Sequence, residues 1–182
     1  MSVKYDWENP AVIKKGKEDG HVIAMPYDVP ERALERGDSP YKLSLNGKWK
    51  FHWQMGLENI PENFYGKDFE DSSWDEITVP SVWQMQGYSK PFYYASTFSR
   101  AFSMKKSKIP YIKHDLQEMG IYRRTFTVPA DWDGREIFLH FGAAKSALVV
   151  YVNGEFVGYS QGSMTPHEFD ITKYLVSGEN QV

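Results

Sequence analysis

Hydrophobic and polar residues alternate along much of the chain after residue 40, and this period of two is typical of half-buried β-strands. The first such run contains Leu43, Leu45, Trp49, Phe51 and Trp53. Asn46-Gly47 within it predicts a turn between two short strands. Further strands are predicted at 77–80, 121–128, 136–141, 147–152, 155–159 and within 167–175, and one more begins at 179–182.

Asn153-Gly154 lies between two of these runs and is the strongest hairpin signal, because both turn residues must adopt positive φ. Strands recur about every ten residues and no long helical pattern interrupts them. The pattern therefore predicts an all-β protein, a β-sandwich built from residues 41–182.

Residues 1–40 show only weak periodicity. The segment Met25-Pro-Tyr-Asp-Val-Pro30 should be extended, because each proline disfavours helical backbone in the residue before it. About one helical turn is expected at 31–36. We interpret residues 1–40 as an extended N-terminal arm that lies across the surface of the sandwich.

Residues 81–120 form a long connection without strong periodicity, and such stretches in compact domains are usually functional or disordered. Aromatic residues suggest that its first half is packed. Its second half, Met104-Lys-Lys-Ser-Lys-Ile-Pro110, is expected to be solvated.

Composition narrows the possible functions. The 182 residues carry a formal charge of −3, which argues against a generic nucleic-acid binder. The absence of cysteine excludes disulfide frameworks, iron–sulfur clusters and cysteine nucleophiles. No apolar run approaches the ~20 residues of a membrane helix, so no membrane partner is expected. The first ten residues contain no apolar signal core, and we expect a cytoplasmic location.

Candidate chemistry is sparse. None of the five histidines lies in a hydrolase or zinc-protease motif, and His140, in an apolar strand, is expected to be structural. The carboxylates between Asp68 and Glu76 are interpreted as a solvated loop. Aromatic rings can stack on sugars, and Trp83, Tyr93 and Tyr94 are the better candidates because they lie in the long connection. These patterns do not by themselves reveal a catalytic site.

Colinear motifs nevertheless resemble a known family. They include Asp6-Trp-Glu-Asn-Pro10, Leu45-Asn-Gly-Lys-Trp-Lys-Phe51, Val79-Pro-Ser-Val-Trp-Gln-Met-Gln-Gly-Tyr88 and Val152-Asn-Gly-Glu-Phe-Val-Gly-Tyr-Ser-Gln161. The chain is similar over this whole length to the amino-terminal part of β-galactosidases of glycoside hydrolase family 2.

The resemblance implies a galactose-binding-like jelly-roll domain of a longer enzyme that hydrolyses terminal β-galactosides such as lactose. The two catalytic glutamates would lie on a later TIM-barrel domain, so this chain would hold no catalytic residue. More of the domain would follow Val182. Later domains of the same chain and further copies in a homo-oligomer are the implied partners.

The resemblance also implies two sites. A loop asparagine of relatives that touches galactose aligns with Ala95, which has no polar side chain, and Tyr94 or Ser96 could substitute for it. A structural Mg²⁺ of relatives would be held here by Asp6, Asn9, the Val12 carbonyl and Gln161. These are hard oxygen donors, which suit Mg²⁺, although Asp6 and Asn9 also favour turns without any ion.

Two other functions stay open at this point. A free-standing carbohydrate-binding module would bind sugar by stacking on a sandwich loop. A purely structural or oligomerisation module would bind none, and alanine at position 95 is consistent with it. Titration with galactose and lactose would separate these two alternatives.

Overall fold

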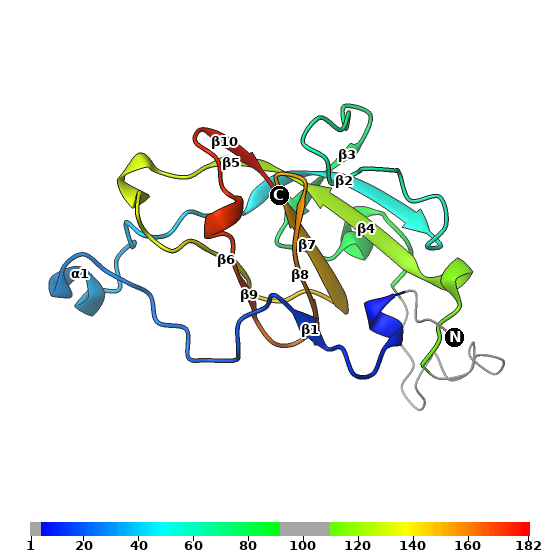
Figure 1. Cartoon of the computed structure of the whole chain (residues 1–182), viewed down its shortest axis with the longest axis horizontal. Coiled ribbons are helices and arrows are strands. Elements are labelled where there is room, and N and C mark those ends of the chain that lie inside the picture. The colour runs from blue at the N-terminus through cyan, green and yellow to red at the C-terminus, as the bar shows by residue number, and fades with distance from the viewer. Residues whose placement is uncertain (1–4, 92–109) are drawn as a thin grey trace.

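The computed structural model describes residues 5–91 and 110–182, and almost all of its regular structure is β (Figure 1). The strands are β1 (Lys14–Lys15), β2 (Gly47–Met55), β3 (Asp75–Val79), β4 (Glu118–Arg123), β5 (Thr125–Thr127), β6 (Phe138–Phe141), β7 (Ala147–Val152), β8 (Glu155–Gln161), β9 (His167–Asp170) and β10 (Glu179–Gln181). One short α-helix, α1, spans Pro30–Leu34, and single 3₁₀ turns lie at Asp6–Glu8, Trp83–Gln86, His114–Leu116, Ala130–Trp132 and Thr172–Tyr174.

Every strand pairing in the described chain is antiparallel, and the strands form four small sheets. Their orders are β3-β2-β4, β1-β8-β7, β6-β9 and β10-β5. Short antiparallel sheets that pack face to face are the pattern of a sandwich, and the all-β prediction is confirmed.

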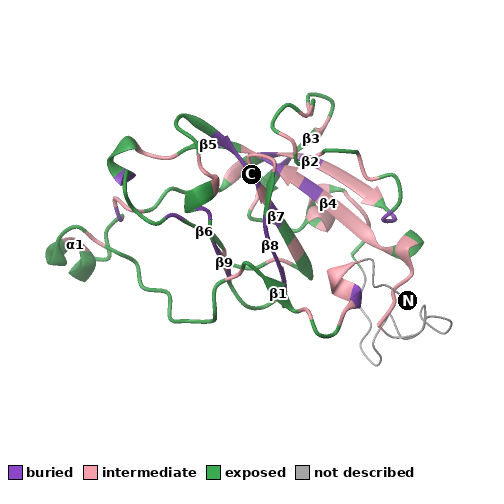
Figure 2. Cartoon of the chain, in the orientation of Figure 1, coloured by how far each residue is buried: buried purple, intermediate pink, exposed green. Residues whose placement is uncertain are grey.

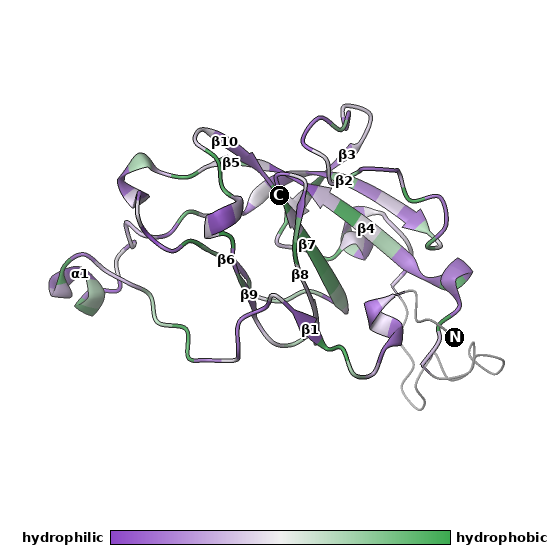
Figure 3. Ribbon diagram, viewed as in Figure 1, coloured by the Kyte–Doolittle hydropathy of each residue, from purple (hydrophilic) through white to green (hydrophobic). Residues whose placement is uncertain are grey.

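The core consists of two hydrophobic clusters, which appear as purple segments inside the ribbon of Figure 2. The larger contains Val150, Val152 and Phe169 from β7 and β9, and the last two are fully buried. The smaller contains Trp49, Phe51 and Ile77 from β2 and β3. Leu45 and Val182 pack against both clusters and so join them. Figure 3 shows β7 as a nearly continuous hydrophobic run, as expected for a strand of the larger cluster.

The predicted hairpin is confirmed. β7 and β8 pair across Asn153-Gly154, and both turn residues have positive φ, 52° and 87°. The Asn153 side chain donates to Asn180 Oδ1 at 2.7 Å, and its Oδ1 accepts the Gln181 amide at 2.9 Å. This network places β10 beside the turn, and the strand predicted at the end of the sequence is present.

The predicted turn at Asn46-Gly47 is wrong. Residues 41–46 form no strand, and Gly47 begins the nine-residue strand β2. The physical reason is Arg124, whose Nη1 binds the carbonyl oxygens of Leu45 at 2.9 Å and Asn46 at 3.1 Å. These bonds hold the approach to β2 outside any ladder.

The strand predicted at 121–128 is two strands. β4 pairs with β2, β5 pairs with β10, and the chain changes partner at Arg124. The backbone of Arg124 exchanges two hydrogen bonds with Val182, at 2.8 and 3.0 Å. Apolar alternation runs through the switch, although Tyr122 of β4 packs against the smaller cluster and Phe126 of β5 belongs to the larger one.

The arm is tied to the sandwich through β1, which adds to the edge of β8. Lys14 and Lys15 pair with Ser160 and Tyr159. The expected helical turn is α1, which lies far from the sheets in Figure 1. No helix in the described ranges 5–91 and 110–182 has the length and apolar character needed to cross a membrane.

Candidate functional site

The junction between the arm and β8 brings together part of the predicted metal site. Pairing of β1 with β8 places Gln161 beside the arm, where its backbone amide donates to the Ile13 carbonyl at 3.1 Å. Its side-chain Nε2 lies 3.3 Å from the Val12 carbonyl and 2.5 Å from the Tyr159 hydroxyl. Two of the four predicted ligand residues, Val12 and Gln161, are therefore in direct contact.

The other two predicted ligands have protein partners. Asp6 Oδ1 accepts from Lys15 Nζ at 2.7 Å, and Asn9 Oδ1 accepts from the Ala11 amide at 3.1 Å. Burial raises the pKa of the Tyr159 hydroxyl, its bond with Gln161 opposes the rise, and the Asp6 carboxylate adds to it. The bond from Lys15, whose backbone pairs with Tyr159, places Asp6 on the Tyr159 side of the junction.

The donor set at this junction fits a hard cation in its chemistry. A carboxylate, two side-chain amide oxygens and a carbonyl are the ligands that Mg²⁺ prefers. To bind a cation, the Gln161 side-chain amide must flip so that Oε1 takes the place of Nε2. The flip is allowed because the two ends of an amide group have nearly the same shape. Only one of these ligands is charged, and no group of three or more His, Cys, Asp or Glu residues in the described ranges could hold a metal.

The predicted sugar-contact residues Tyr94, Ala95 and Ser96 lie outside the described residues. The chain that leads toward them is anchored by Glu118 at the start of β4. Its Oε2 accepts from Trp83 Nε1 at 3.1 Å, and its Oε1 accepts from the Ser89 hydroxyl. Trp83 and Tyr88 also pack against the Trp49 cluster, so the predicted packing is present at these two residues. The other aromatic residues of this half lie outside the described residues: Phe92, Tyr93, Tyr94 and Phe98.

A second carboxylate, Glu8, anchors the segment just before β4, at residues 112–114. Glu8 comes from the arm and is 3% exposed. Its Oε1 accepts the Ile112 amide at 3.1 Å and lies 2.7 Å from His114 Nε2. Sequence reasoning missed this residue, since its only signal was its position between Asp6 and Asn9 in the turn-like segment of the arm.

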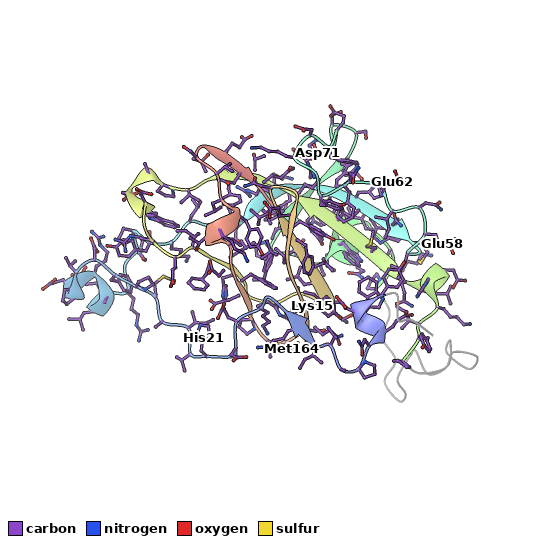
Figure 4. The ribbon with its side chains drawn as sticks, in the orientation of Figure 1. Lys15, His21, Glu58, Glu62, Asp71 and Met164 are labelled. Atoms are coloured by element: carbon purple, nitrogen blue, oxygen red, sulfur yellow. The ribbon has the colours of Figure 1, made fainter. Side chains whose placement is uncertain are left out.

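The histidine and the acidic loop named from the sequence both have protein partners. His140, predicted to be structural, is 39% exposed, and its Nδ1 contacts Glu168 Oε1 of the paired strand β9 at 2.8 Å. The buried histidine is His167, because alternation in β9 turns His167 and Phe169 inward. The acidic loop is only partly solvated, since Asp71, labelled in Figure 4, accepts from the buried Arg123 guanidinium at 2.7 Å.

Comparison with known proteins decides the family. Residues 43–182 match the model described as glycosyl hydrolases family 2, sugar binding domain. The chain belongs to this family. The recognised resemblance is thereby confirmed, and the matched range includes all strands from β2 to β10.

Curated relatives of this family-2 domain are named β-galactosidase. The chain is 39% identical over 180 residues to the one from Priestia megaterium, which covers 97% of this chain and 17% of that protein. It is 36% identical to the one from Psychromonas ingrahamii, with coverage of 97% and 16%. The chain therefore spans about one sixth of the length of these relatives.

Solved structures with the same fold include β-glucuronidase 2 from Bacteroides uniformis. The match has a TM-score of 0.53 and 27% identity, and it covers 76% of this chain and 14% of that one. A β-glucuronidase from Bifidobacterium dentium matches in fold with a TM-score of 0.52. The sequence relatives and the structural neighbours thus carry names of two different glycosidase activities.

Proposed function

We propose that this family-2 domain is the non-catalytic, amino-terminal domain of a β-galactosidase, where it shapes the mouth of the active site. The observation that carries the proposal is the 39% identity to the Priestia megaterium β-galactosidase over nearly the whole chain. Hydrolysis with retention needs two carboxylates about 5–5.5 Å apart on either side of the glycosidic bond. In this proposal both come from a region outside the 182 residues.

The domain's own contribution is to hold the connection between β3 and β4 at the mouth of the active site. Glu118 binds Trp83 and Ser89, in the first part of this connection. Glu8 binds Ile112 and His114, in its last part. Carboxylates that accept several hydrogen bonds hold backbone more firmly than exposed side chains can. Tyr94 and Ser96 are the proposed sugar contacts.

A chimera tests this function. Residues 1–182 replace the matching 180 residues of the Priestia megaterium enzyme, and hydrolysis of a chromogenic β-galactoside is measured. We expect the chimera to be active and a Glu8→Ala version to lose activity with a raised KM. Met85→Ala, at an exposed position, is the control and should leave activity unchanged. A well-folded, inactive chimera would contradict the proposal.

The same chimera addresses the choice of sugar, because the structural neighbours are named β-glucuronidases. Side-by-side assay of a β-galactoside and a β-glucuronide should show turnover of the galactoside alone. Preference for the glucuronide would move the assignment to the other activity of the family.

We also propose a weak Mg²⁺ site at the arm junction, held by Asp6, Asn9, the Val12 carbonyl and Gln161. The ion would supply fixed positive charge that ties the arm to β8. Titration of the chain with MgCl₂ should shift the amide signals of these residues, and Asp6→Asn should abolish the shift. Equal shifts in that variant would exclude the site.

Assembly into a homo-oligomer is a further part of the proposal. The arm presents large apolar side chains to solvent, among them Val22 at 90% and Leu34 at 84% exposure. Exposed apolar patches of this kind commonly mark contact surfaces. Light scattering should show association of the isolated chain at high concentration, and a strictly monomeric chain would count against this part.

A further inference from the structure

His21, on the arm, contacts the sandwich through both of its ring nitrogens in a way that defines its protonation. Nδ1 lies 2.8 Å from the Asp19 carbonyl, which can only accept, so Nδ1 carries a proton. Nε2 lies 2.8 Å from Glu168 Oε2, and a carboxylate also only accepts. Both nitrogens must donate, and the observed contact is that of an imidazolium cation.

The His21–Glu168 contact lies in a long stretch of the arm that has few other bonds to the sandwich. Within residues 5–91 and 110–182, it is the only hydrogen bond or ion pair that joins the segment 20–38 to a β-strand. Before it, the Glu18 amide donates to the Glu168 carbonyl at 2.9 Å. After it, the next tie to the body is Trp132 Nε1 on the Pro40 carbonyl at 3.0 Å. Figure 4 shows His21 on this stretch of the arm.

The Glu168 carboxylate is held in place to accept a hydrogen bond from His21. It lies on β9, is 16% exposed, and its second oxygen, Oε1, is held by His140 Nδ1 from the paired strand β6 at 2.8 Å. His21, Val22, Ile23 and Glu168 line one shallow depression of about 520 Å³ with Thr165 and Pro166. The ion pair therefore holds this stretch of the arm at the rim of the depression, where the Val22 side chain stays 90% exposed.

We propose that His21 is a proton-dependent latch: protonated His21 docks the arm around residues 20–23 on β9 through Glu168, and neutral His21 releases it. A neutral imidazole with its proton on Nδ1 would turn a lone pair toward the carboxylate, and the two would repel. The other neutral tautomer, with its proton on Nε2, would keep the bond to Glu168 but lose the bond to the Asp19 carbonyl and the ion pair, so loss of the proton weakens the contact in either form.

The surrounding charges favour the protonated state. The hydrogen bond to the Asp19 carbonyl raises the pKa of His21, burial opposes this rise, and the charges of Glu168 and Glu18 add to it. Lys17 is the nearby arm cation, whereas the Asp19 carboxylate is already paired with Lys14. On the sandwich side His140 bonds Glu168, and His167 faces the interior against Ser160.

Nuclear magnetic resonance of the full 182-residue chain tests the latch. The His21 ring should titrate above its ordinary value of 6.5, and the Val22 and Ile23 amide shifts should follow the same midpoint. Exposed ion pairs are weak, so amide exchange at Val22 and Ile23, corrected for intrinsic rates, should be about two- to fivefold slower at low pH than at high pH. High salt should reduce this difference.

Three variants make the test decisive. His21→Ala should exchange rapidly at both pH values, and Glu168→Gln should return the His21 titration toward its ordinary value. His52→Ala is the matched control, because His52 stacks on Trp74 at 5.3 Å and does not touch the arm. Exchange at Val22 that is independent of pH in the unmodified chain, or an equal loss of pH dependence in the control, would overturn the proposal.

Discussion

Arg123 and Asp71 form a partly buried ion pair, with Nε donating to Oδ2 at 2.7 Å. The Arg123 side chain is 5% exposed and also binds the carbonyl oxygens of Phe64 and Gly66. Its guanidinium lies 5.3 Å from the centre of the Phe69 ring. One side chain of β4 thereby holds residues 64–71 of the loop that joins β2 to β3.

The first prediction concerns this clamp. Arg123→Ala should lower the free energy of unfolding by about 3–5 kcal/mol, because it leaves a carboxylate and two carbonyl groups without their donor. Urea denaturation measures the change. Arg32→Ala is the control: its partner Asp28 lies four residues earlier, just before α1, and exposed pairs of this kind contribute about 0.2–1 kcal/mol. Equal effects of the two variants would contradict the role of Arg123.

Trp49 is the second target. It is 8% exposed, packs with Phe51 and Ile77, and donates from Nε1 to the Leu45 carbonyl at 2.8 Å. Trp49→Ala should cost about 3–5 kcal/mol and is expected to lower the melting temperature sharply. Met85→Ala, at a position 77% exposed, should leave the melting temperature almost unchanged. A soluble Trp49→Ala protein that melts like the parent would refute the placement.

Stability should depend on pH through His167. Burial lowers the pKa of this histidine from its ordinary 6.5, with smaller contributions from Lys17 and His140. Because the unfolded chain binds the proton more readily, the stabilisation is fully present above the unfolded pKa and is lost as the pH falls below it. Thermal melting between about pH 7 and pH 5 should show this decline. In His167→Gln the decline should be shallower, and an identical slope would argue against it.

Free galactose should bind the isolated chain more weakly than about 1 mM, which corresponds to −4.1 kcal/mol. Alanine at position 95 offers no side-chain hydrogen bond, and a sugar site needs several placed polar groups. Titration calorimetry and chemical-shift mapping report the affinity. Saturable binding at sub-millimolar galactose would instead favour a free-standing carbohydrate-binding module.

Much of the fold could be predicted from local patterns. The Asn153-Gly154 hairpin, the strand at 179–182 and the short helix near residue 31 all follow from turn chemistry and alternation, and each is present. The break between β4 and β5 could not be predicted, because alternation continues through it. The candidate site could be predicted only in part. The family resemblance named Val12 and Gln161, which are in contact, but it did not name Glu8.

The sequence by itself determined which segments can be strands, the hairpin turn at Asn153-Gly154 and the family to which the domain belongs. These properties depend on neighbours along the chain, whose side-chain spacing and backbone preferences are written in a few consecutive residues. Only the tertiary structure decided which charged side chains are buried and which partners they bind. Glu8 meets His114 across 106 residues, and Arg123 meets Asp71 across 52. A carboxylate becomes an anchor only when a distant donor is folded onto it, because its burial is otherwise too costly.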